Sequence, residues 1–135
     1  MTGFANHRRV ATVTLVVGSY DEAIAWYVER LGFLLTEDVD LGGGKRWVTV
    51  APANGQAARL LLAEADGEAQ EKSIGNQTGG RVFLFLETDD FARDHKAMLE
   101  KGVGFREAPR FEPYGTVAVF ADLYGNLWDL IEPKG

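Results

Sequence analysis

The sequence contains no cysteine among its 135 residues. Disulfide bonds, thiol nucleophiles and cysteine-ligated zinc or iron–sulfur centres are therefore excluded. No apolar run approaches the roughly 18 residues that a membrane-spanning helix needs. Positively charged residues are also fewer than acidic ones: the sequence has 14 lysines and arginines and 20 acidic residues, which gives a formal net charge of -6. Nucleic acids and anionic membrane surfaces favour a basic protein face, so neither is an expected partner.

The stretch from Met1 to Arg9 carries no apolar segment of the kind found in secretion signals, which predicts a cytoplasmic protein. The length is that of one ordinary domain, and we expect a single domain over residues 1–135. Its composition, 46% hydrophobic and 25% charged, is typical of a globular chain rather than a disordered one.

Hydrophobic periodicity predicts the same order of elements twice, a strand, a helix and three further strands. Leu31-Gly32-Phe33 lies about 70 residues before the similar Lys101-Gly102-Val103. We therefore predict an α+β fold of two tandem β-α-β-β-β modules that form a curved mixed sheet with a concave cup. The first module spans about 8–64, a linker 65–79 and the second module about 80–133. The glycine run from Gly42 to Gly44 is predicted as a hairpin turn.

Alternation along the strands divides the predicted sheet into two faces. One face is apolar throughout and is expected to lie under the helices. The other, which we call the cup face, mixes apolar bulk with a few polar groups, as ligand pockets do. The cup face comprises Thr12, Thr14, Trp47, Thr49, Arg59, Leu61, Phe83, Phe85, Val117, Val119, Leu127 and Asp129. A dimer interface or a second core would explain the same pattern.

Two segments resemble a known family. The strand Val13 to Val17 with the helix that follows, and the close Gly125-Asn126 before Asp129-Leu130, are similar to the vicinal oxygen chelate superfamily. That superfamily includes glyoxalase I, bleomycin-resistance proteins and extradiol dioxygenases. The resemblance implies paired β-α-β-β-β modules and a homodimer.

In metal-dependent members, the resemblance implies a divalent ion held at the positions of Thr12, Leu61, Phe83 and Asp129. Only Asp129 is an ordinary ligand here, because leucine and phenylalanine donate nothing and a threonine hydroxyl is a poor donor. Neither of the two histidines falls on the cup face. We therefore predict no bound metal and no cofactor.

Asp129 is the candidate catalytic residue, because burial would raise the pKa of its carboxyl and suit it to general-base work or to a cationic ligand. The alternative is a remnant of the family's ligand position, held by a hydrogen bond. Arg59 could pair with Asp129 or hold an anionic ligand, or lie exposed at a strand end. The aromatic residues could stack on a flat ligand or belong to the core. The candidate ligand contacts are Thr12, Trp47, Thr49, Arg59, Leu61, Phe83, Phe85, Tyr114, Val119 and Asp129.

The sequence thus favours metal-independent binding of a small organic molecule in the cup. Two other functions stay open: a metal-dependent lyase or dioxygenase of the same superfamily, and an interaction module whose cup another subunit fills. The residues do not decide whether the protein is an enzyme, or whether the modules share a cup within one chain or across a dimer.

Overall fold

The computed structural model describes residue 3, residues 7–52 and residues 58–135, so part of the N-terminal stretch behind the cytoplasmic prediction lies outside the described residues. The first half contains β1 (Thr12–Val17), α1 (Tyr20–Leu31), β2 (Leu34–Gly42), β3 (Lys45–Ala51) and β4 (Arg59–Glu64). The second half contains β5 (Val82–Glu87), α3 (Phe91–Glu100), β6 (Gly104–Phe105), β7 (Arg110–Glu112), β8 (Gly115–Ala121) and β9 (Leu127–Pro133), and α2 (Glu68–Ser73) lies between the halves. The predicted α+β class is confirmed.

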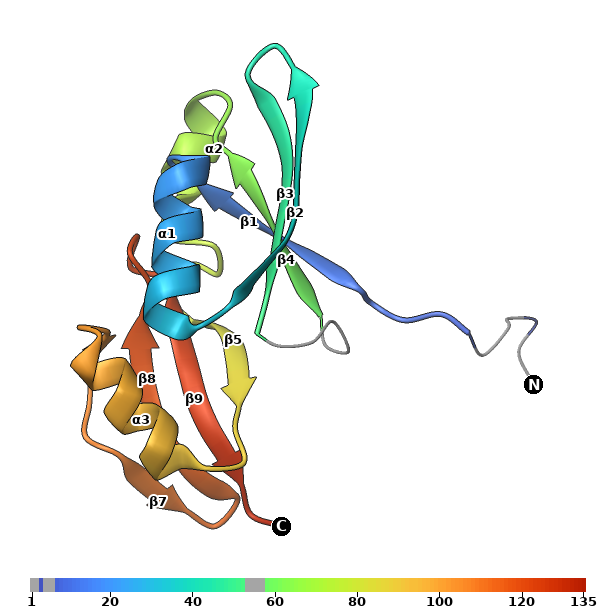
Figure 1. Cartoon of the computed structure of the whole chain (residues 1–135). Helices are drawn as coiled ribbons and strands as arrows, with labels where there is room; N and C mark the ends of the chain where they lie inside the picture. The colour runs from blue at the N-terminus through green and yellow to red at the C-terminus, as the bar shows by residue number, and fades with distance from the viewer. Residues whose placement is uncertain (1–2, 4–6, 53–57) are drawn as a thin grey trace.

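The strands form two mixed sheets, one from each half of the chain (Figure 1). The first has the order β1-β4-β3-β2, and the second the order β5-β9-β8-β6 with β7 also paired to β8. In each sheet the first strand of the half pairs in parallel with the last one, β1 with β4 and β5 with β9. The two halves therefore share one topology, as the internal duplication predicted.

Helix α1 is capped at both ends by residues that suit helix termini. The Ser19 side chain accepts a hydrogen bond from the backbone N–H of Glu22, and Gly32 ends the helix in the left-handed conformation at φ 72°. The inner face of the helix buries Ala23 and Tyr27. Within the described residues, no helix is long and apolar enough to cross a membrane.

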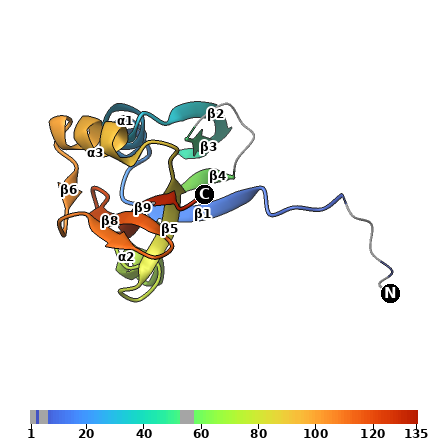
Figure 2. The same cartoon turned by 90° about the horizontal axis from the view of Figure 1, so that it is seen from below.

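The helices α1 and α3 lie on the same side of the molecule, next to each other in both views (Figures 1 and 2). A single hydrophobic core joins the two halves beneath them. The ring of Tyr27 lies 5.6 Å from that of Phe33 and 6.0 Å from that of Trp128 in β9. Neither half has a separate core, because the inner faces of both sheets pack against the same aromatic cluster.

One buried hydrogen bond crosses between the halves at this cluster. The hydroxyl of Tyr27 donates to Oδ2 of Asp122 at 2.7 Å. The same carboxylate accepts from the backbone N–H of Tyr124 and from both the backbone and the side chain of Asn126. The Gly-Asn turn between β8 and β9 is thus built around Asp122, and burial followed by that charge raises the pKa of Tyr27 well above its ordinary value.

The polar stretch predicted as a linker contains α2 and is fixed against both halves. The side-chain amide of Gln77 donates to the backbone oxygen of Val16 in β1 at 3.4 Å and accepts from its N–H at 3.3 Å. At Gly75, which has φ 75°, an added Cβ would lie 2.1 Å from the backbone oxygen of Tyr124. The polar composition alone did not predict this helix or its docking.

We expect Tyr27→Phe to lower the free energy of unfolding by about 2 kcal/mol, because the variant removes a buried hydrogen bond to a carboxylate and keeps the ring. Urea denaturation at one fixed protein concentration measures this. Tyr114→Phe is the matched control, because Tyr114 is 55% exposed. Equal stability of the two variants would contradict a structural role for the bond.

Candidate functional site: two polar networks on the cup face

The two faces of the sheets follow the predicted alternation over most of their length. Leu15, Val17, Val48 and Leu62 on the helix side are fully buried. Val82 and Phe83 in β5 depart from the prediction, and the physical reason is a β-bulge. The register of β5 with β9 shifts between Val82 and Leu84, which moves the alternation by one residue.

As a consequence, Phe83 lies with the core and not beside the other cup-face residues. Its ring meets that of Trp128 edge-on at 6.3 Å, and it packs against the hydrophobic core. Val82, expected under the helices, instead lies opposite Leu127 of the cup face. A strict period of two cannot reveal a bulge, because the inserted residue leaves no mark of its own in the hydrophobic pattern.

On the first sheet, the cup face carries a connected polar network that we call network A: Thr12, Glu37, Trp47, Thr49 and Arg59. Oε1 of Glu37 accepts from Nε1 of Trp47 at 3.1 Å and from Oγ1 of Thr49 at 3.1 Å. Arg59 reaches the same oxygen at 3.5 Å and donates to Oγ1 of Thr12 at 3.3 Å. Trp47 remains 39% exposed, so the network presents an aromatic surface held in a fixed orientation.

Sequence reasoning missed Glu37, the residue at the centre of network A. The donors Trp47 and Thr49 hold the pKa of its carboxyl below the ordinary value. Its register position opposite Thr49 would have shown that it shares the cup face, but only once the pairing of β2 with β3 was known. The predicted contact Leu61 in β4 also lies on this face, where it is directly opposite Thr49 of β3.

On the second sheet, Asp129 lies between Phe85 of β5 and Val119 of β8 in the strand register. Phe85 is 62% exposed, whereas Asp129 is only 8% exposed. Oδ1 of Asp129 is buried and has no hydrogen-bond partner among the described residues. Burial raises the pKa of this carboxyl, and Glu107 adds to that rise while Arg110 opposes it.

A second polar group, which we call network B, lies beside Asp129 and consists of Glu107, Arg110 and Glu112. Nε of Arg110 donates to both oxygens of Glu107 at 3.0 Å, and Nη1 donates to Glu112 at 2.8 Å. Glu107 also accepts from the backbone N–H of Val119 at 3.0 Å. The predicted contact Tyr114 is in the turn between β7 and β8 and lies beside Arg110. Sequence reasoning did not find network B, because β7 was not predicted.

The structure does not bring the two groups of predicted contacts together within one chain. Thr12, Trp47, Thr49, Arg59 and Leu61 belong to the first sheet, and Phe85, Tyr114, Val119 and Asp129 to the second. Over residues 7–52 and 58–135, no hydrogen bond or ion pair joins the two groups. The suggested pairing of Arg59 with Asp129 is not formed, because Arg59 contacts Glu37 and Thr12 instead.

The four positions implied for a metal do not fit one. Leu61 and Phe83 have no donor atoms, and Phe83 packs on the core. Within the part of the chain that the structure describes, no group of three or more His, Asp or Glu side chains could hold a metal ion. His95 stacks on Phe91 at 5.2 Å and meets the edge of Phe105 at 4.5 Å, which gives it a packing role on α3.

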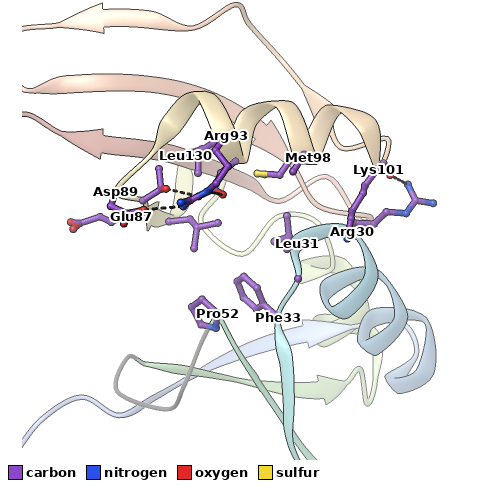
Figure 3. Close-up of a pocket in the computed structure, with 15 residues that line it drawn as sticks. Arg30, Leu31, Phe33, Pro52, Glu87, Asp89, Arg93, Met98, Lys101 and Leu130 are labelled. Atoms are coloured by element: carbon purple, nitrogen blue, oxygen red, sulfur yellow. Dashed lines mark hydrogen bonds and ion pairs between the residues drawn. The ribbon is translucent and has the colours of Figure 1, made fainter.

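A cleft of about 560 Å³ opens on the helix side, between α1 and α3 (Figure 3). Leu31, Phe33 and Leu130 line its apolar part, and Arg30 and Lys101 lie together at one end. None of the predicted ligand contacts lines this cleft. The seam between the two halves creates it, which is why the pattern of single strands did not reveal it.

Comparison with known proteins assigns the family of this chain. The chain belongs to the glyoxalase/bleomycin resistance protein/dioxygenase superfamily, whose model matches residues 9–130. This confirms the resemblance seen in the sequence. A protein of Shewanella frigidimarina (strain NCIMB 400) is 52% identical over 124 residues, covering 91% of this chain and 92% of the relative.

Two solved structures are similar along nearly their full length. The crystal structure of UcmS2 has a TM-score of 0.81 at 29% identity and covers 93% of this chain and 98% of its own. TnmS3, described as an antibiotic binding protein from Streptomyces sp. CB03234, has a TM-score of 0.76 at 29% identity, covering 97% and 100%. A protein described as antibiotic-binding therefore shares the fold of this chain.

We expect Asp129→Asn to raise the melting temperature at pH 7 by about 4 °C, equivalent to about 1 kcal/mol, because the variant removes a charge that is buried without a partner. The folded pKa of Asp129 is raised, so the folded state holds its proton to higher pH than the unfolded chain. The stability of the native protein should therefore fall as pH rises from about 4 through that raised pKa, and the variant should lack this component.

Thermal melting from pH 4 to 8 at one protein concentration checks this expectation. Asp66→Asn is the control, because it makes the same charge change at an exposed position between β4 and α2. A melting temperature that drops in Asp129→Asn would show that the ionised carboxylate stabilises the fold.

Proposed function

We propose that this protein binds a small organic molecule on its cup face, without a metal ion, as a cytoplasmic homodimer. The observation that carries the proposal is the pair of exposed aromatic side chains Trp47 and Phe85, each beside polar groups on the cup face. Two exposed aromatic rings, one of them held by the hydrogen bond of Trp47 to Glu37, suit the recognition of a flat molecule better than a surface that contacts only water.

Two further arguments favour binding over turnover. A glyoxalase-like or dioxygenase-like reaction on this fold would need donors for a metal, and the residues at the implied positions do not supply them. The antibiotic-binding protein TnmS3 has a similar fold, which supports sequestration of an organic molecule as a sufficient function.

The homodimer follows from the separation of the two networks. Network A on one sheet and Asp129 with network B on the other face away from the shared core, so one chain presents two half-sites. A second copy would let the first sheet of one chain close over the second sheet of its partner. Among the described residues, β1 and β5 each pair with one strand, which leaves an outer edge beside each half-site.

A thermal-shift screen of flat aromatic and heteroaromatic compounds tests the binding function. A compound present at about 100 times its Kd should stabilise the protein by about 2.7 kcal/mol. Trp47→Ala should weaken the binding of that compound at least about tenfold, because the compound can no longer stack on the indole ring. Ala97→Arg on α3, which fills the cleft on the helix side, should leave binding intact. If Ala97→Arg lost binding and Trp47→Ala kept it, the binding site would lie in the cleft and not on the cup face.

The dimer is tested by sedimentation equilibrium, where we expect twice the chain mass of 14.8 kDa. Whether each site spans two chains is tested with a heterodimer of Trp47→Ala and Phe85→Ala chains, purified through two different tags. If each site is built from both chains, one site of this heterodimer carries both substitutions and the other carries neither. The heterodimer should then bind about half as much compound as the native dimer. No binding by the heterodimer would show that each site belongs to one chain.

A further inference from the structure

Asp129 has an unusual environment for an acidic residue. Its neighbours Trp128 and Leu130 are buried in the core, so the alternation of β9 directs Asp129 to the cup face. It is more than nine-tenths buried, and no hydrogen bond or ion pair is formed with its side chain by any described residue. A buried carboxyl without a partner is unfavourable, and a ligand group that completes its hydrogen bonds would relieve this.

The groups around Asp129 determine which kind of ligand group fits. Phe85 on one side presents an exposed aromatic ring, and Val119 on the other side is apolar. The nearest cation, Arg110, already donates to Glu107 and Glu112. Three carboxylates, those of Asp129, Glu107 and Glu112, therefore lie near one guanidinium that already pairs with two of them, so the local charge disfavours an anionic ligand and favours a cationic one.

From this juxtaposition we infer that the ligand carries a protonated amine on an apolar or aromatic body, and that Asp129 pairs with the amine while Phe85 faces the cation. The inference rests on the proposed binding function and names the ligand class that the second sheet selects. An amine here gains an ion pair in a poorly hydrated position and a cation–π contact with Phe85.

Three probes of one shape but different charge test the inference: naphthylmethylamine, naphthylmethanol and naphthoate. We expect the native protein to bind the amine at least about tenfold tighter than the alcohol in calorimetric titration at pH 7, with the carboxylate weakest. The affinity for the amine should fall as pH is lowered through the raised pKa of Asp129, because the protonated carboxyl cannot form the ion pair.

Asp129→Asn should reduce the ratio of amine to alcohol affinity to about one, whereas the control Asp66→Asn should keep it. Phe85→Leu, at a position too exposed to disturb folding, should lower the same ratio about threefold through loss of the cation–π contact.

Equal affinity for amine and alcohol in the native protein would overturn the inference while leaving the binding function in place. The same holds if the preference persists in Asp129→Asn. Failure of all three probes and of the wider aromatic screen would instead contradict the proposed function, and this inference with it.

Discussion

The hydrogen bond from Tyr27 to Asp122 joins the two halves of this protein at the centre of a buried aromatic cluster. Its donor belongs to α1 of the first half, and its acceptor organises the turn between the last two strands of the second. Both groups are buried, so the bond is shielded from water, and without Asp122 the hydroxyl of Tyr27 would be left unsatisfied. The relative placement of the two sheets depends on this contact.

Because the halves meet through their helix sides, both cup faces are left outside the shared core. Each face retains polar side chains that are organised within its own sheet, around Glu37 on one and around Arg110 on the other. Network A holds the exposed ring of Trp47 in place, whereas Oδ1 of Asp129 on the other face is buried without a hydrogen-bond partner among the described residues. The proposed organic ligand fits these surfaces better than a metal ion does, since Leu61 and Phe83, at two of the four implied metal positions, have no donor atoms.

Much of the fold could be predicted from the sequence because duplication and alternation are local signals. The repeated order of elements and the buried faces of most strands follow directly from them. The site was predicted less completely. The bulge in β5 moved Phe83 to the core, and Glu37, Glu107 and Arg110 were missed because their importance lies in contacts with residues distant in sequence.

The sequence by itself determined the repeated β-α-β-β-β order, the family and the shortage of side chains that could bind a metal ion at the implied positions. Each of these depends only on residue types and their spacing. The tertiary structure alone decided that Arg59 and Asp129 do not meet within one chain, because the side on which the two halves pack depends on the complementary shapes of Tyr27, Phe33 and Trp128. It also decided that Asp129 is buried without a partner, which no pattern along β9 could show.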